Sequence, residues 1–184
     1  MPDSPKAKAA FLDRDGVIIE DRGYVFRPAD LAFLPGVIEA LLRLKGMGYQ
    51  LILITNQSGV ARGYFDESDL SLFHNHLQRE LKKAGAPPLD AIYYCPHHPE
   101  AKIKAYRQQC DCRKPKPGML TRAIHEHNIA VDQSFMVGDK ARDTEAGRLA
   151  GVKTALIGPS ERDPLADQSA ASLLELIQIP HFLQ

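Results

Sequence analysis

Two patterns of apolar and polar positions alternate along most of the chain. Short, nearly continuous apolar runs such as residues 49–56 are typical of strands buried on both faces of a parallel sheet. Longer segments such as residues 66–85 place Leu70, Phe73 and Leu77 on one face of a helix. These patterns predict strands over 9–13, 49–56, 89–95, 134–139 and 152–158, and helices over 36–48, 66–85, 118–128, 142–151 and 170–179.

The order of these elements predicts the fold class. Strands and helices that alternate with short connections are typical of an α/β fold with an open, doubly wound, Rossmann-like sheet that is mostly parallel. Residues 16–35 and the polar loop at residues 96–117 do not follow the alternation. No repeat or low-complexity tract is present, and we expect one domain over residues 1–184.

The composition excludes several classes of function. The hydrophobic content of 44% and charged content of 25% are ordinary for a soluble globular protein. Lys plus Arg equals Asp plus Glu at 23 each, so no overall charge attracts nucleic acid or a membrane. The apolar runs are too short to span a bilayer, and the N-terminus lacks the apolar core of a signal peptide. We therefore expect a cytoplasmic protein.

Polar residues follow three of the predicted strands. The first strand ends in Asp13 and Asp15, and the fourth in Asp139, with Asp143 one helical turn further on. The second strand ends in the hydroxyl and amide groups of residues 55–58. Each group by itself is also explained as a turn or a helix cap. Together they predict one site, because ligands of an open α/β sheet bind at the carboxyl ends of its strands.

This combination of groups indicates phosphate chemistry. Several carboxylates suit a hard cation such as Mg²⁺, which prefers oxygen ligands and is often bound together with phosphate. Phosphoryl transfer needs a nucleophile, groups that neutralise the phosphate oxygens, and a proton for the leaving group. Asp13 is the candidate nucleophile, and its repulsion from a phosphate dianion would be offset by Mg²⁺ and a lysine.

The same segments resemble known motifs. FLDRDGV (11–17), ITNQSG (54–59), CRKPKPGM (112–119) and MVGDKARD (136–143) are similar to the four motifs of the haloacid dehalogenase superfamily of phosphatases. More narrowly, DRGYVF, TNQSGVARGYF and YYCPHHP resemble the D-glycero-D-manno-heptose-1,7-bisphosphate 7-phosphatase family. The resemblance covers residues 9–158 and implies a sheet of the haloacid dehalogenase type. No large cap domain is expected, because only residues 16–35 separate the first motif from the first predicted helix.

The resemblance also implies a role for particular residues. Asp13 would form an aspartyl-phosphate, and Asp15 would protonate the leaving group and then activate water. Thr55 would hold the phosphoryl oxygens, and Lys114 would neutralise their charge. The Asp13 carboxylate, the Asp15 backbone carbonyl and Asp139 would bind Mg²⁺. The residues that match substrate-binding positions are Arg14, Asp21, Arg22, Gly23, Tyr24, Asn56, Gln57, Ser58, Arg113 and Lys140.

The sequence leaves the role of Asp143 open between support of the metal site and a simple helix cap. We interpret five histidines as polar helix faces or terminal residues without a catalytic role: His74, His76, His125, His127 and His181.

All three cysteines of the chain lie in one polar loop, at residues 95–112. An odd number of cysteines argues against a disulfide framework and makes metal binding worth testing. The candidate ligands of a closed, structural zinc site are Cys95, His97, Cys110 and Cys112. The family pattern favours His97 over His98, and free thiols beside an exposed histidine are the alternative. Zinc would order the loop that delivers Arg113 and Lys114 to the phosphate.

The resemblance implies a phosphatase that removes the 7-phosphate of D-glycero-D-manno-heptose 1,7-bisphosphate, in the synthesis of activated heptose for lipopolysaccharide. Histidinol-phosphate phosphatase, whose family shares the zinc loop, and a broader sugar-phosphate phosphatase are the alternatives. Histidinol phosphate is cationic and favours acidic surroundings, whereas Arg62 and Arg113 suit an anionic bisphosphate.

Two further classes of protein fit the sequence less well. A noncatalytic binding module would not need both Asp13 and Asp15, and a polynucleotide 3'-phosphatase would need a basic track for the strand. We therefore expect a small-molecule sugar bisphosphate as the partner, no nucleic acid or membrane, and a monomer.

Overall fold

Six parallel strands form one sheet at the centre of the molecule, in the order β3-β2-β1-β4-β5-β6. The computed structural model describes residues 6–158 and 163–183, so the ends of the predicted domain lie outside the described residues. The strands are β1 (Lys8–Leu12), β2 (Tyr49–Asn56), β3 (Ala91–Cys95), β4 (Phe135–Gly138), β5 (Lys153–Ile157) and β6 (Gln168–Ala170). The predicted doubly wound α/β fold is confirmed.

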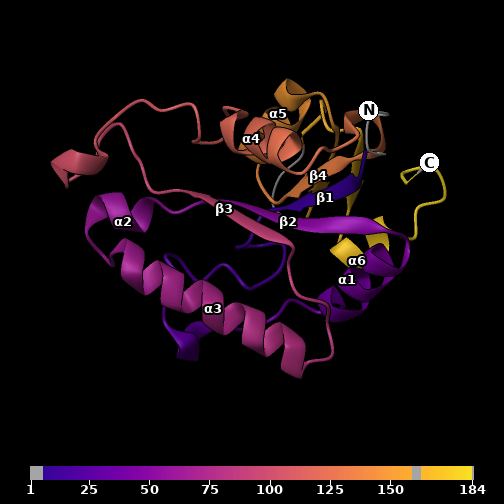
Figure 1. The fold of residues 1–184 in the computed structure, drawn as a ribbon, viewed down its shortest axis with the longest axis horizontal. Helices are drawn as coiled ribbons and strands as arrows, with labels where there is room; N and C mark the ends of the chain where they lie inside the picture. The colour runs from indigo at the N-terminus through magenta and orange to yellow at the C-terminus, as the bar shows by residue number, and fades with distance from the viewer. Residues whose placement is uncertain (1–5, 159–162, 184) are drawn as a thin grey trace, which may run out of the picture.

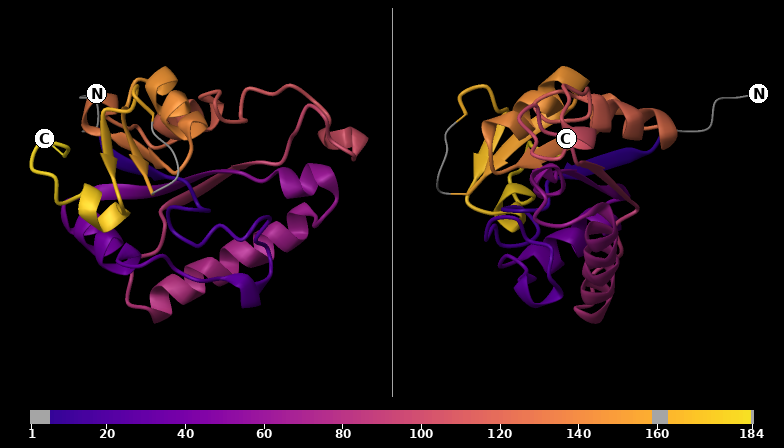
Figure 2. Two further views of the ribbon diagram at one scale, coloured as in Figure 1. Left: turned by 180° about the vertical axis from the view of Figure 1, so that it is seen from behind. Right: turned by 90° about the vertical axis from the view of Figure 1, so that its left-hand side faces the viewer.

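Helices cover both faces of this sheet (Figures 1 and 2). One face carries α1 (Val37–Gly46), α3 (Glu67–Lys83) and α6 (Leu173–Leu176). The other face carries α4 (Gly118–Glu126) and α5 (Ala141–Ala150). Short α2 (Ser58–Arg62) directly follows β2. None of the described helices is both long and apolar enough to cross a bilayer.

The alternation of side chains along β1 explains why the sheet needs two layers of helices. Ala10 and Leu12 belong to the core beneath α1 and α3, whereas Ala9 and Phe11 belong to the core beneath α4. All four side chains are fully buried. A strand that is buried on both faces has no polar positions, which is why its sequence appears as an apolar run.

The C-terminal region differs from the sequence prediction. A helix was predicted over residues 170–179, but the chain forms edge strand β6 and a shorter α6. The side chain of Ser172 accepts a hydrogen bond from the backbone N–H of Glu175, and this cap starts α6 at Leu173. Strand β6 is partly exposed at the sheet edge, so it lacks the apolar run that marks the central strands. Its three residues give no periodicity to detect.

Neither irregular segment forms a cap domain among the residues that the structure describes. Val17, Ile18 and Ile19 are fully buried, and a bridge between Ile19 and Phe33 closes the first segment onto the core. The second segment runs beside α2 in the ribbon (Figure 1), where the backbone N–H of Ile103 donates to the carbonyl of Ala61 at 3.0 Å. The strand order reverses between β1 and β4, so the carboxyl ends of these two strands mark the expected ligand site.

Candidate active site

Carboxylates from β1, β4 and α5 converge where the strand order reverses. Asp13 follows β1, Asp139 follows β4, and Asp143 lies in the first turn of α5. One oxygen from each of the three carboxylates lies within 4.8 Å of the others. Gly16, at φ +82°, permits this approach, because a Cβ there would lie 2.5 Å from Cγ of Asp139.

The buried ammonium of Lys114 joins two of these carboxylates. Its Nζ lies 2.9 Å from Asp13 Oδ1 and 2.8 Å from Asp143 Oδ1, and donates to the Ile54 carbonyl at 2.7 Å. Burial by itself would lower the pKa of Lys114, but the charges of Asp13 and Asp143 outweigh it and raise that pKa. Lys114 is therefore positively charged at the point where a phosphate dianion would meet Asp13.

Asp143 forms the helix cap that was one of its two predicted roles, and it also pairs with Lys114. Its Oδ2 accepts from the backbone N–H of Lys140 at 3.1 Å, which caps α5, while its other oxygen faces Lys114. The side chain is fully buried. Asp143 thus holds the lysine together with Asp13 and fixes the start of α5.

Asp15 is held beside the carboxylate cluster by Arg14 and Gln57. The Arg14 guanidinium donates to both carboxylate oxygens at 3.0–3.2 Å, and Gln57 Nε2 donates to Oδ2 at 3.1 Å. Burial raises the pKa of the Asp15 carboxyl, with Arg14 opposing the rise and Asp13 adding to it. A raised pKa suits a carboxyl that must deliver a proton to a leaving group.

The predicted contact between Arg14 and a substrate does not fit its position. Its side chain is fully buried: the guanidinium donates to the Val25 carbonyl at 2.7 Å and lies 4.9 Å above the ring of Phe73. Its Nη1 is 3.3 Å from Nε2 of His74. Arg14 therefore positions Asp15 and cannot reach a ligand in the open site.

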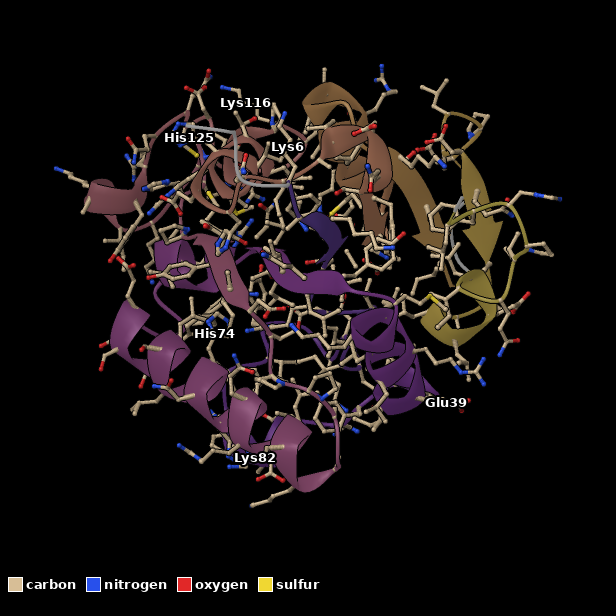
Figure 3. All side chains as sticks on the ribbon, turned by 45° about the vertical axis from the view of Figure 1, so that its right-hand side comes forward. Lys6, Glu39, His74, Lys82, Lys116 and His125 are labelled. Carbon is tan, nitrogen blue, oxygen red and sulfur yellow. The ribbon has the colours of Figure 1, made fainter. Side chains whose placement is uncertain are left out.

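His74 also departs from its interpretation as a polar helix face. It lies between α3 and the sheet (Figure 3) and is only 6% exposed. Burial first, and then the charge of Arg14, lowers its pKa to about 3, so the ring is neutral. The helical spacing is a signal for this burial, because His74 lies four residues after Leu70 and three before Leu77 and so belongs to the inner face. Its partner Arg14, which lies far away in the sequence, could not be predicted from that spacing.

The residues after β2 support the neighbouring groups. Gln57 Nε2 donates to Thr55 Oγ1 at 2.8 Å and thus links the threonine to Asp15. The side-chain amide of Asn56 binds the backbone N–H and carbonyl of Lys114, both at 3.0 Å. Asn56 therefore positions Lys114, and its amide is occupied there rather than directed at a substrate. Ser58 is half-buried at the start of α2.

The predicted substrate segment at residues 21–24 is exposed. Asp21 Oδ1 accepts from the backbone N–H of Gly23 at 3.0 Å, and Arg22 pairs with Glu20 at 2.6 Å. Tyr24 has φ 51°, an uncommon value for a residue with a side chain, and its ring packs edge-on against Tyr64. Lys140, the last of the predicted set, pairs with Asp139 at 3.2 Å.

Three sulfur atoms and one imidazole nitrogen meet in the polar loop. The Sγ atoms of Cys95, Cys110 and Cys112 are 3.0–3.5 Å apart, too far for a disulfide, and Nδ1 of His97 is 3.4 Å from Cys112 Sγ. A tetrahedron with metal–sulfur bonds of about 2.3 Å has edges of about 3.7 Å. Hydrogen bonding with Cys95 lowers the pKa of Cys112 to about 5, which favours a thiolate. The cluster has the donors and size of a tetrahedral metal site.

The polar loop is followed by two positively charged residues, Arg113 and Lys114, whose side chains point to different places. Lys114 projects into the core, and the preceding Arg113 donates to the carbonyl of His97 at 3.2 Å. His98, the rival metal ligand, points elsewhere: its Nδ1 accepts from the backbone N–H of Glu100. The structure thus brings His97, and not His98, to the three sulfurs.

Comparison with known proteins agrees with this geometry. A model of the HAD-hydrolase-like family matches residues 111–174. A D-glycero-beta-D-manno-heptose-1,7-bisphosphate 7-phosphatase from Pasteurella multocida is 53% identical over 150 residues, which are 82% of this chain and 80% of that protein. One of the same name from Haemophilus ducreyi is 46% identical and covers 92% of this chain and 96% of that protein.

A solved structure is similar as well. D,D-heptose 1,7-bisphosphate phosphatase from B. bronchiseptica, complexed with magnesium and phosphate, superposes with a TM-score of 0.79 at 32% identity. The match covers 91% of this chain and 94% of that chain.

Proposed function

Because the chain belongs to the D-glycero-beta-D-manno-heptose-1,7-bisphosphate 7-phosphatase family of HAD-like hydrolases, we propose that it removes the 7-phosphate of that sugar and leaves the 1-phosphate. The chain is a phosphoric monoester hydrolase. The observation that carries the proposal is the buried Asp13–Lys114–Asp143 arrangement beside Asp139. It places a candidate nucleophile, a fixed positive charge and a further carboxylate at one point of the sheet edge.

In the first step, a carboxylate oxygen of Asp13 attacks phosphorus. The bond between phosphorus and the sugar oxygen breaks while the bond to Asp13 forms, and Asp15 gives its proton to the leaving sugar oxygen. In the second step, Asp15 takes a proton from water, which attacks phosphorus and releases inorganic phosphate and Asp13. Asp13 Oδ1 contacts Lys114 Nζ and also accepts from the backbone N–H of Arg14 at 2.8 Å, which leaves Oδ2 for the attack.

Lys114 acts on the transferring group through its charge, since its ammonium already contacts Asp13, Asp143 and the Ile54 carbonyl. Thr55 is the group that would bind a phosphoryl oxygen. The ammonium of Lys114 offsets the repulsion between Asp13 and the phosphate, and its ion pair with Asp143 keeps it in place. Thr55 is buried, and Gln57 links it to Asp15 by donating a hydrogen bond to each of the two side chains. The Thr55 hydroxyl is thereby positioned for a phosphoryl oxygen. These groups are held by the fold before substrate arrives, which is what electrostatic stabilisation of a transition state requires.

The carboxylate cluster also fits a hard divalent cation. Burial, and then the charge of Asp13, raises the pKa of Asp139. The negative charges of the two carboxylates are therefore not fully balanced by the cations around Asp139. We propose that Asp13, Asp139 and the backbone carbonyl of Asp15 hold Mg²⁺, and that Asp143, whose oxygens face Lys114 and Lys140, supports them. Bound Mg²⁺ would neutralise charge on the phosphate oxygens.

The sulfur cluster supports a structural zinc ion. Four donors fill a tetrahedron and leave no open position, so zinc would order the loop that carries Arg113 and Lys114 and would take no part in the reaction. Three cysteine ligands must stay reduced, which a cytoplasmic location would ensure. Every catalytic group proposed above comes from one chain, so a monomer is sufficient.

Zinc content tests this part of the proposal. We expect about one zinc per purified chain, and Cys110→Ser should lose it and leave residues 96–112 open to proteolysis, because the site then lacks one of its four ligands. The measurements are elemental analysis and limited proteolysis. Lys104→Ser, in the same loop but away from the sulfurs, is the matched control and should retain the metal. A wild-type protein without zinc would remove this part of the proposal.

Side-by-side specificity constants test the substrate. We expect kcat/KM for the β-anomer of heptose 1,7-bisphosphate to exceed that for histidinol phosphate and fructose 1,6-bisphosphate by about 100-fold or more. Phosphorus NMR of the product should show that the 1-phosphate remains. Equal or faster turnover of histidinol phosphate would instead support the histidinol-phosphatase alternative.

A further inference from the structure

One carboxylate joins α3, the sheet and the tip of the polar loop. Glu67, the first residue of α3, accepts a hydrogen bond on each of its two oxygens, at 2.6 Å from the phenol of Tyr94 and at 2.7 Å from the phenol of Tyr106. Tyr94 belongs to β3, and Tyr106 is the last residue of the 3₁₀ turn η2 (Lys104–Tyr106). Glu67 therefore attaches the loop tip to α3 with one oxygen and α3 to the sheet with the other.

Both phenols act as donors to this carboxylate. Burial, and then hydrogen bonding with Glu67, raises the pKa of Tyr94 to about 12, and the hydrogen bond with Glu67, followed by burial, raises the pKa of Tyr106. Both hydroxyls therefore keep their protons at neutral pH. Their short distances to the carboxylate oxygens are those of charge-assisted hydrogen bonds, which are about twice as strong as bonds between neutral groups.

The backbone of Glu67 is fixed independently of the loop. Asp66 Oδ1 accepts from the backbone N–H of Asp69 at 2.8 Å, and Asp69 Oδ2 accepts from the backbone N–H of Asp66 at 3.1 Å. This pair is a capping box, which holds the first turn of α3. Leu70, one turn further on, is fully buried in the core. Glu67 therefore presents its carboxylate from a rigid helix start.

The loop tip, by contrast, has few buried groups of its own. In residues 102–109 every residue is exposed except Tyr106, which is half-buried. The Tyr106 ring packs against the small apolar cluster of Val60, Phe65 and Leu70. The tip is also attached to α2 by the hydrogen bond from the Ile103 N–H described above. A segment with so little buried surface is ordered by a small number of contacts, so each of them matters.

The tip is connected to a residue at the border of the site. The Tyr106 carbonyl accepts from the backbone N–H of His98 at 3.1 Å, and the Tyr106 ring lies 6.2 Å from the imidazole of His97. The His97 carbonyl in turn accepts from the Arg113 guanidinium at 3.2 Å. A shift of the tip would therefore move His97 and Arg113, whereas Lys114 would keep its buried contacts in the core.

We propose that Glu67 is a positioning residue, whose hydrogen bond to Tyr106 docks the polar loop on α3 and so places Arg113 beside the reacting groups. Zinc would hold the base of the same loop at the cysteines, and Glu67 holds its tip. The effect on substrate binding rests on the proposed function, because Arg113 is one of the predicted substrate-binding residues. The docking of the loop does not rest on it.

Limited proteolysis and steady-state kinetics test the inference together. Tyr106→Phe removes only the hydroxyl and keeps the ring in its apolar contacts, so trypsin should cleave after the exposed Lys104 and Arg107 about fivefold faster or more. KM for heptose 1,7-bisphosphate should rise by about 5- to 20-fold and kcat should stay within about twofold, because the reacting groups keep their contacts. Glu67→Ala should have the same effects, and Glu67→Gln, whose amide oxygen still accepts, should restore part of the loss.

Tyr94→Phe is the matched control. It removes the hydroxyl that binds the other oxygen of the same carboxylate, on the side of the sheet. Cleavage of the loop and KM should stay within about twofold of the wild type, because the capping box still holds Glu67. The zinc content of each variant should equal that of the wild type, since none of the four candidate ligands is changed.

The outcomes separate this inference from the proposed function. Wild-type cleavage and KM in Tyr106→Phe and Glu67→Ala would overturn the inference. Equal effects of Tyr94→Phe would do so too, because they would assign Glu67 to the attachment of α3 to the sheet, and loss of zinc from Tyr106→Phe would assign the effect to the metal site. None of these results touches the wild-type rate on the bisphosphate. A wild-type enzyme without that turnover would instead remove the proposed function, while proteolysis would still decide whether Glu67 docks the loop.

Discussion

Asp13→Asn is expected to reduce the rate of phosphate release by about 10⁴-fold or more, because an amide oxygen cannot replace the carboxylate that bonds to phosphorus. The fold should tolerate the change. The asparagine oxygen can accept the same two hydrogen bonds, from Lys114 and from the backbone N–H of Arg14, and Lys114 keeps Asp143 as a partner. The loss would therefore be one of chemistry and not of structure.

The measurement has two parts. Steady-state release of phosphate gives the rate, and acid quenching of the wild-type enzyme during turnover, followed by peptide mass spectrometry, should find phosphate on the peptide that contains residue 13. Asp132→Asn, an exposed aspartate in the short 3₁₀ turn before β4, is the matched control. Turnover of Asp13→Asn within tenfold of the wild type would falsify the covalent mechanism.

Lys114→Met is expected to have the largest effect on stability. The substitution leaves Asp13 and Asp143 facing each other in the core without the ammonium that joins them. Removal of one partner from a buried ionic arrangement costs about 3–5 kcal/mol of the free energy of unfolding. The rate of phosphate release should also fall by about 10²–10³-fold, because a fixed positive charge at the phosphate is lost.

A double variant separates the two effects. Lys114→Met with Asp143→Asn removes one buried negative charge while the amide oxygen still accepts from the Lys140 N–H, so most of the stability should return and the activity should not. Urea unfolding and steady-state rates are the measurements. Lys116→Met, two residues along and half exposed, should change the free energy of unfolding by less than about 0.5 kcal/mol. A Lys114→Met variant as stable as the wild type, or an active double variant, would contradict the assigned role.

Features could be predicted from the sequence where the local pattern and the tertiary environment agree. Strand β2 is covered on both faces, so its position was visible as an apolar run over 49–56. The four motifs could be related to one site because parallel strands carry their carboxyl ends to one edge. The resemblance to the heptose bisphosphate phosphatase family was likewise correct, as the relatives at 46–53% identity show.

Other features had no local signal. Strand β6 is short, polar and at the edge, and α2 is too short for a helical period. The position of Arg14 depends on residues at a large distance along the chain: Val25, Phe73 and His74 enclose a side chain that the motif alone places near the substrate. The sequence pattern shows which chemical groups a residue carries, but it does not show which other residues surround that residue in the folded protein.

The sequence by itself determined the order of the elements, the set of reactive side chains and the family. These features depend on residue types and on spacings of a few positions. Because side chains repeat every 2 residues along a strand and every 3.6 along a helix, such spacings show directly which face or end of an element a residue occupies. Only the tertiary structure decided that Arg14 and Asn56 position other residues and that Asp143 pairs with Lys114. Such pairings join segments up to 60 residues apart, and packing, not local preference, sets which atoms meet.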